Sequence, residues 1–411
     1  MLQRTIGIYK DSFGGLQSTV WLLSALQLIN RSGTMVLPFM SMYMTQKLGA
    51  TLSQAGVVLM CFGLGAIVGS FAGGKLTDNI GHRKVMIGSL FAGGIFFIFL
   101  GYLKNYQLIC LFSFLLSAIN EAFRPANMAA IGSYSDETNR TRSSSLVRLS
   151  VNLGWAVGAS IGGWIAAHNY QYLFWVDGTT NLVAAGFAMI FLPKGTEEGK
   201  RQKKSDETGL VNSVWKDSDY LIFVLLKFLY AICFFQLFST LPVFLKTIYV
   251  LGEHQIGWVM ALNGLLIAIF EMVIVFKLSQ KNNYQAYIFI GTILMGISFI
   301  ILNFVFTNLF AMALISSIII TAAEILTMPF MMGYMLNRAH PSNLGQYASL
   351  YVLAFAGANV VGPLTGSMIA DHYGFNFLWW CVCGLCILTA FGYVLLFKRT
   401  SQKVVTSQNI D

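Results

Sequence analysis

The stretch Gly73-Gly-Lys-Leu-Thr-Asp-Asn-Ile-Gly-His-Arg-Lys84 separates two long apolar runs. The run before it, residues 53–71, and the run after it, residues 85–103, contain no charged residue. A helix needs about 20 apolar residues to cross a bilayer core of about 30 Å. Two such runs joined by a short polar segment therefore predict a helical hairpin in a membrane.

The composition of the whole chain leads to the same class. Of its 411 residues, 56% are hydrophobic and only 10% are charged, whereas soluble domains carry about 25% charged residues. So little charge cannot cover a surface that faces water. The chain is therefore expected to be a polytopic membrane protein, and its net charge of +9 is assigned to membrane loops rather than to nucleic-acid binding.

Twelve apolar runs follow the polar segment 1–16, and each is long enough to span a membrane. Since period-2 alternation is absent, and lipid-exposed backbone must be satisfied internally, the runs are predicted to be α-helices. The predicted spans are residues 19–43, 52–73, 84–103, 108–132, 145–167, 171–192, 219–245, 254–277, 285–306, 309–335, 345–370 and 375–397.

The distribution of Lys and Arg sets the orientation, because cytoplasmic loops are enriched in both. With the N-terminus inside, the outer loops hold only Lys47, Lys104 and Lys246, and the other loop cations fall on the inner side. We therefore expect a cell (inner) membrane protein with both termini in the cytoplasm.

An internal repeat divides the chain. Leu37-Pro38 recurs as Leu241-Pro242, 204 positions later, and Pro125 recurs at Pro329 with the same offset. The hydrophilic segment between the halves is interpreted as a solvated linker, with a regulatory site as the alternative. The predicted division is an N-terminal six-helix bundle (1–192), a cytoplasmic linker (193–218), a C-terminal six-helix bundle (219–397) and a cytoplasmic tail (398–411).

The loop that opens this section contains a longer pattern, Gly-x-Leu-x-Asp-x-x-Gly-x-Arg-Lys, and it resembles the loop between the second and third helices of the major facilitator superfamily. His82 stands where that family usually has Arg or another basic residue. The resemblance implies twelve helices in two bundles related by a pseudo-two-fold axis along the membrane normal. It also implies a central cavity lined by the first, fourth, seventh and tenth helices, and a gating loop. The gating residues are Gly74, Asp78, Gly81, Arg83 and Lys84.

Polar residues inside the apolar runs fall mainly on those four helices. An ionisable group in a span is costly and usually faces a cavity or a partner, and Glu121 and Arg124 are spaced to pair on one helix face. The expected substrate-binding residues are Asn30, Arg31, Glu121, Arg124, Asn127, Gln236 and Glu324. Glu121 and Glu324 are the expected proton carriers, and Arg31 and Arg124 suit a carboxylate.

Four further ionisable residues in apolar runs receive no assigned role from the sequence. They are Glu271, Asp177, Arg148 and Lys227.

Two branches of the superfamily remain open. Gln27-x-x-Asn30-Arg31 and Arg124-Pro125-Ala126-Asn127 resemble motifs of proton-coupled oligopeptide transporters, although both first-helix carboxylates of that motif are amides here. The segment Gly154–Gly163 resembles the fifth-helix motif of drug–proton antiporters without its Pro. Uptake of a peptide-like solute is favoured slightly, and drug efflux is the alternative.

Other classes fit the sequence less well. No cofactor motif or catalytic triad is found, so the chain is not expected to be an enzyme, and a proton gradient is the expected energy source. The cysteines Cys381, Cys383 and Cys386 are interpreted as apolar packing residues rather than as a metal site. The expected partners are a small-molecule substrate, protons and the lipid bilayer, with no nucleic acid, and the protein is expected to be a monomer.

Overall fold

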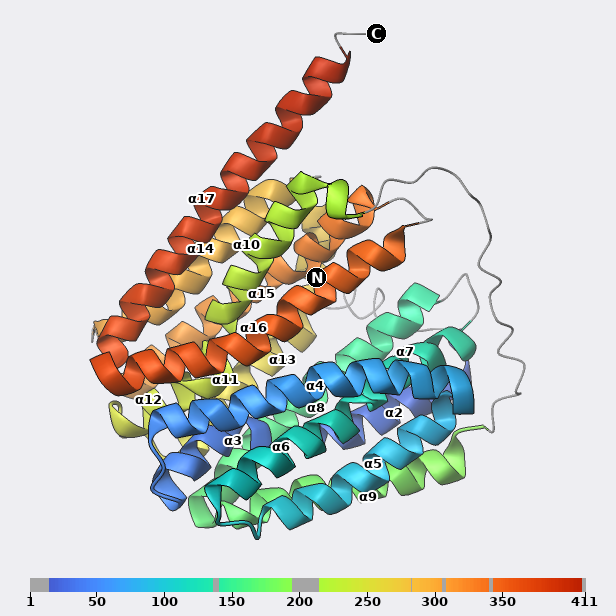
Figure 1. The fold of residues 1–411 in the computed structure, drawn as a ribbon, viewed down its shortest axis with the longest axis vertical. Helices are drawn as coiled ribbons and strands as arrows, with labels where there is room; N and C mark the ends of the chain where they lie inside the picture. Colours follow the sequence, from blue (N-terminus) through green and yellow to red (C-terminus); the bar gives the residue numbers. More distant parts are fainter. Residues whose placement is uncertain are drawn as a thin grey trace, which may run out of the picture. The chain divides into compact units, whose positions relative to one another are not determined.

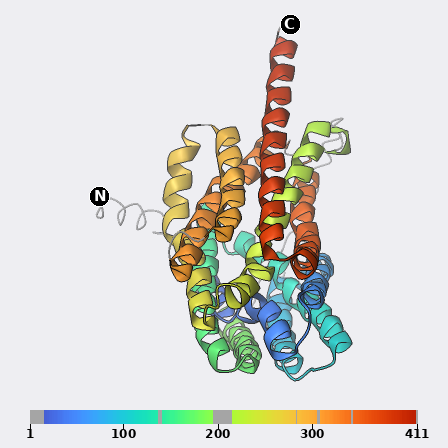
Figure 2. The ribbon, with the colours of Figure 1, turned by 90° about the vertical axis from the view of Figure 1, so that its left-hand side faces the viewer.

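A computed structural model describes residues 15–135, 140–193, 214–281, 283–304, 308–339 and 343–408. Within these ranges every regular element is helical (Figure 1, Figure 2), and eleven helical spans are long and apolar enough to cross a membrane. The main helices are α2 (Ser18–Ser32), α3 (Val36–Met42), α4 (Leu52–Ile80), α5 (His82–Leu100), α6 (Tyr106–Glu121), α7 (Phe123–Ser133), α8 (Arg140–His168), α9 (Gln171–Phe191), α10 (Ser218–Phe234), α11 (Gln236–Ser239), α12 (Leu241–Thr247), α13 (Glu253–Ser279), α14 (Tyr284–Ile300), α15 (Leu309–Arg338), α16 (Leu344–Tyr373) and α17 (Phe375–Gln408). A π-helical turn (Tyr43–Lys47) and the 3-10 turns Val214–Lys216 and Ile301–Asn303 complete the set.

The helices group into two compact units. Of the described residues, those between 15 and 39 and between 61 and 193 form unit 1, and those between 40 and 60 and between 214 and 408 form unit 2. In unit 1, α2 packs on α8 and α5 packs on α9; in unit 2, α14 packs on α15 and α17, and α10 packs on α16. Most of the predicted linker 193–218 lies outside the described residues.

The beginning of α4 belongs to unit 2 and packs on α16. The backbone N–H and the hydroxyl of Ser53 both donate to Oδ2 of Asp371, at 3.2 and 2.6 Å. Nearby, a Cβ at Gly56 would lie 2.6 Å from Cβ of Ser367. The absence of a side chain at Gly56 therefore permits the close approach of α4 to α16.

Three predicted helices are broken. The span 19–43 is divided into α2 and α3, the span 108–132 into α6 and α7, and the span 219–245 into α10, α11 and α12. A proline inside a helix removes one hydrogen bond and clashes with the carbonyl four residues earlier. Pro125 lies four residues after Glu121, where α6 ends, and Pro242 lies at the start of α12. Leu37-Pro38 lies in α3, after the break that follows α2. The repeated Leu-Pro pair therefore follows a helix break in both halves.

The predicted hairpin is tighter than its sequence suggests. We expected the second span to end at residue 73, but α4 continues through Gly73 and Gly74 to Ile80. Gly81 alone separates α4 from α5, with a φ of +86°, a value that favours glycine. Helix α17 is likewise longer than predicted, since it continues past residue 397 to Gln408 (Figure 1).

A row of glycines on α4 packs against α6. A Cβ at Gly65 would collide with the carbonyl oxygen of Phe114, and a Cβ at Gly69 would collide with that of Ala118. Small residues at regular spacing let two membrane helices approach closely. This row therefore serves helix packing, as its position inside an apolar run predicts.

Candidate functional site

Arg31 lies at the end of α2, where the helix packs most closely on α8. A Cβ at Gly154 would lie 2.7 Å from Cβ of Arg31, and a Cβ at Gly158 would lie 3.0 Å from the carbonyl oxygen of Ser32. The glycine row of α8 therefore sets the position of the arginine backbone. In this chain the segment that resembles an antiporter motif holds α2 against α8.

Glu121 and Arg124 form the ion pair that their spacing predicts. Oε2 of Glu121 lies 3.1 Å from Nε of Arg124, and their side chains are 22% and 57% exposed. The pair spans the break between α6 and α7. Arg31 interacts electrostatically with both residues. An exposed pair of this kind contributes at most about 1 kcal/mol to stability, so its main consequence is local charge.

Several buried polar atoms beside these charges have no hydrogen-bond partner in the described part of the chain. They are Oε1 of Gln27, Nε of Arg31 and Oδ1 of Asn127. Buried polar groups are normally hydrogen-bonded, so unsatisfied ones mark positions that a ligand or water can occupy. Asn30 differs, because its amide donates to Oδ1 of Asn181 at 3.1 Å.

Asp177 has a structural role that the sequence does not reveal. It is fully buried on α9, and its carboxylate accepts hydrogen bonds from the backbone N–H groups of Met35 and Val36 at 2.8–3.1 Å. These N–H groups lie at the start of α3, and the free N–H groups of a helix start attract a carboxylate. Asp177 thus caps the second half of the broken first helix. The sequence signal for such a remote cap is a helix restart after Gly33 without a local capping residue.

Glu324, on α15, is buried among neutral polar groups. Its Oε1 accepts a hydrogen bond of 2.7 Å from Asn263 of α13, whose amide also donates to Oγ1 of Thr321 at 3.1 Å. One turn along α15, Oγ1 of Thr327 lies 2.6 Å from the hydroxyl of Tyr230. In the part of unit 2 that the structure describes, Glu324 forms no ion pair. The arrangement can therefore hold a proton on the acid.

Gln236 has protein partners at both ends of its amide. Its Nε2 donates to the carbonyl oxygens of Gly362 and Ile232, at 2.9 and 3.0 Å, and its Oε1 accepts from Oγ1 of Thr240 at 2.9 Å. The side chain is 1% exposed. Gln236 therefore secures the broken seventh span to α16, and this geometry leaves its amide no free position for a ligand.

The residues predicted to form a gating loop surround the single-residue turn at Gly81. Arg83 donates to the carbonyl oxygens of Met189 and Leu192, at 2.6 and 3.0 Å, and so satisfies acceptors at the end of α9. Asp78 is exposed and makes no hydrogen bond or ion pair with any residue that the structure describes. Gly74 has open space where a side chain would lie. Lys84 lies beside Arg83 in the first turn of α5.

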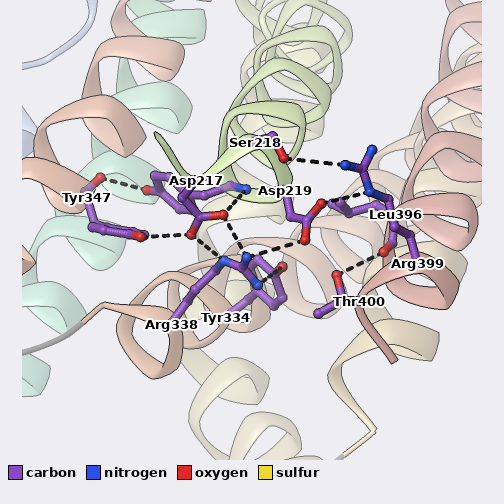
Figure 3. Close-up of polar contacts among 10 residues, drawn as sticks. Asp217, Ser218, Asp219, Tyr334, Arg338, Tyr347, Leu396, Arg399 and Thr400 are labelled. Carbon is purple, nitrogen blue, oxygen red and sulfur yellow. Dashed lines mark hydrogen bonds and ion pairs between the residues drawn. The ribbon is translucent and has the colours of Figure 1, made fainter. Parts of the chain in front are cut away.

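A cluster of charges joins four helices at one end of unit 2 (Figure 3). Asp217, just before α10, accepts two 2.7 Å hydrogen bonds from Arg338 and one of 2.7 Å from the hydroxyl of Tyr347. Asp219 is 3% exposed and pairs with Arg399 at 3.1 Å and with Arg338 at 3.6 Å. Sequence reasoning treated these cations only as loop charges.

The pKa of Asp217 reflects this cluster. Burial alone would raise the pKa of its carboxyl group, but hydrogen bonds from Arg338, Tyr347 and the backbone of Tyr220 outweigh burial and hold the pKa below its ordinary value. The carboxylate is therefore charged at neutral pH.

Glu271 lies on α13 and Arg148 on α8.

Comparison with known proteins identifies the family. The Na(+), Li(+), K(+)/H(+) antiporter of Planococcus maritimus is 23% identical, over 92% of this chain and 95% of that protein. The class B tetracycline resistance protein of Escherichia coli is 23% identical, over 77% of this chain and 79% of that protein. A crystal structure of a POT family transporter in complex with 5-aminolevulinic acid shares the fold, with a TM-score of 0.78 and 16% identity, over 94% of this chain and 97% of that one. The model of the Major Facilitator Superfamily matches residues 20–281 and, in an overlapping match, 245–410, so this chain belongs to the major facilitator superfamily.

Proposed function

We propose that this protein is a proton-coupled secondary active transporter that moves a small organic solute by alternating access. In this proposal it is a monomer with twelve spans in two bundles, and both termini lie on the cytoplasmic side of the inner membrane. The observation that carries the proposal is the environment of Glu324. A buried carboxylate without a basic partner is costly in its charged form, and a proton removes that cost.

The roles of the other residues follow from their contacts. Arg31 and Arg124 attract an anionic group, and the unsatisfied atoms of Gln27 and Asn127 offer neutral hydrogen bonds. Glu121 forms an ion pair with Arg124 and is the second proposed proton carrier. Gain or loss of its proton would change the strength with which the two arginines hold a solute. Asn30, whose amide donates to Asn181, is also proposed to bind the solute.

A proton-driven drug or cation antiporter is the second candidate. Two relatives favour it, since one is an antiporter for Na(+), Li(+) and K(+) with protons and the other is a tetracycline resistance protein. The likeness to the POT family structure supports the fold alone, at 16% identity. Both candidates require proton coupling, and they differ in the direction in which the solute moves.

Proteoliposomes with an imposed pH gradient and an entrapped pH dye test the proposal. The probes are 5-aminolevulinic acid, a dipeptide, tetracycline and NaCl, each added to either side. We expect at least one probe to change proton flux, and the side from which it acts gives the direction. Glu324→Gln should abolish gradient-driven movement while solute exchange without a gradient persists.

Glu253→Gln is the matched control, because Glu253 is paired with Lys246 at 2.8 Å. If Glu121→Gln and Glu324→Gln both leave pH-driven transport intact, the assignment of the proton carriers is wrong.

A further inference from the structure

Lys227 is a buried cation on α10, inside the apolar span Ser218–Ser239. It is 4% exposed. Its Nζ donates to the backbone carbonyl oxygen of Tyr351 at 2.6 Å and lies 3.5 Å from the centroid of the Tyr351 ring. The ring of Phe355 lies 5.2 Å away. One face of α16 therefore supplies every contact that the structure gives this amine.

The amine lacks a counter-charge. Elsewhere in unit 2, Lys246 pairs with Glu253 and Arg399 pairs with Asp219, but Lys227 forms no ion pair with any residue that the structure describes. An ammonium group has three donors, and here one carbonyl and one aromatic face receive them. Burying a cation inside a span is costly, and a cation–π contact returns only part of that cost. The remaining cost favours an anionic partner.

The surroundings of the amine are aromatic. Phe355 contacts Phe235 at 4.9 Å and Phe234 at 5.8 Å, between ring centroids. These rings come from α10, from its break and from α16, so they form an apolar wall beside a single positive charge. A carboxylate on a flat apolar body complements that combination, since pockets for such ligands pair apolar walls with a few placed polar groups.

We propose that Lys227 binds the anionic group of a small organic solute, a carboxylate carried on an aromatic or apolar body that packs on Phe355. The inference rests on the proposed transport function and names its substrate class. Helix α10 ends at Phe234, seven positions after Lys227, and α11 begins at Gln236. In the proposal, rearrangement at this break opens the buried amine to the solute during the transport cycle.

Binding to the purified full-length protein in lipid nanodiscs tests the inference. Benzoate is the probe, and benzamide is its neutral match. We expect benzoate, and not benzamide, to raise the unfolding temperature of the wild-type protein. Lys227→Met should weaken benzoate binding at least tenfold, whereas Lys227→Arg should retain most of it. Lys246→Met removes a cation that already has an acidic partner and should bind benzoate like the wild type.

Several results would overturn the inference. They are equal binding of benzoate and benzamide, no binding of benzoate to the wild type, and unchanged binding in Lys227→Met. The stability of Lys227→Met separates a ligand role from a structural one. Removal of an unpaired buried cation should leave the unfolding temperature unchanged or raise it, and a clear fall would show that the amine is structural. Because these measurements need no gradient, they can fail while pH-driven transport in liposomes succeeds, and the reverse.

Discussion

Asp217 accepts a hydrogen bond of 2.7 Å at each carboxylate oxygen from the guanidinium group of Arg338, and so joins the start of α10 to the end of α15 (Figure 3). This bidentate geometry is the strong form of an ion pair. Tyr347 adds a third hydrogen bond from α16. Unit 2 is therefore tied together at one end by charge, where its helices leave their apolar spans.

The first prediction concerns acid stability. The folded-state pKa of Asp217 is lowered, so its contribution is present above the unfolded pKa of about 3.9 and is lost as the pH falls through the folded value. Asp217→Asn keeps an N-cap acceptor but removes the charge. We expect it to cost about 2 kcal/mol at pH 7, with the difference from the wild type shrinking below about pH 4. Thermal unfolding in detergent at several pH values measures this.

Asp78→Asn is the control for that titration, since Asp78 is an exposed acid. If the loss of stability in Asp217→Asn, relative to the wild type, stays constant down to pH 3, the ionised carboxylate of Asp217 is not the source of the stabilisation.

The second prediction concerns the cap of α3. Asp177→Ala leaves the N–H groups of Met35 and Val36 buried without an acceptor, and each unsatisfied group costs about 1–3 kcal/mol. We expect a loss of about 3 kcal/mol in the free energy of unfolding and a smaller loss for Asp177→Asn, which keeps one acceptor oxygen. Chemical denaturation measures both. Thr179→Ala is the control, because Thr179 is exposed and bonds only to carbonyls of its own helix.

The third prediction concerns the contact between α8 and α2. Gly154→Ala would place a methyl group 2.7 Å from Cβ of Arg31 and 3.0 Å from the carbonyl oxygen of Leu28. Overpacking of this kind costs about 1–3 kcal/mol, and it displaces Arg31. We expect a lower unfolding temperature and weaker transport of the probe that the wild type carries.

Gly88→Ala on α5 is the control for Gly154→Ala, since nothing lies within 4 Å of its Cβ position. It should be neutral or stabilising, because alanine favours a helix over glycine by about 0.5–1 kcal/mol. Equal effects of the two substitutions would refute the packing argument.

Local pattern predicted the features that depend on neighbours along the chain. The apolar runs, the hairpin around Gly81 and the pairing of Glu121 with Arg124 all follow from spacing over a few residues. The branch motifs were less informative. The glycines of α8 resembled a transport motif and Gln236 was an expected substrate-binding residue, and the structure shows that both make packing contacts between helices.

The features that the sequence did not reveal depend on distant residues. Asp177 and Val36 are 141 positions apart, and Arg338 lies 121 positions from Asp217. The sequence around Asp177 or Asp217 does not predict the partner of the acid, because a buried carboxylate can be satisfied by backbone N–H groups, by a guanidinium group or by a proton. Only the packing of the helices decides between these outcomes.

The last prediction concerns the charges of the loop. Asp78 lies in the last turn of α4, and His82, Arg83 and Lys84 lie in the first turn of α5. The helix dipole disfavours an acid at a C-terminus and bases at an N-terminus, by about 0.3–1 kcal/mol each. Arg83 offsets its cost through the carbonyls at the end of α9, whereas Asp78 has no compensating contact among the described residues. We therefore expect Asp78→Asn to keep or raise the unfolding temperature and yet to slow transport.

The two readouts separate function from stability. Ligand binding by purified Asp78→Asn should match the wild type, while the turnover of pH-driven transport should fall at least tenfold. Asn79→Ala, at the next exposed position of α4, should leave transport unchanged. Normal turnover in Asp78→Asn would show that this acid has no part in gating. A fall in unfolding temperature would instead show that the carboxylate stabilises the hairpin, and the unfavourable placement of its charge would then need another explanation.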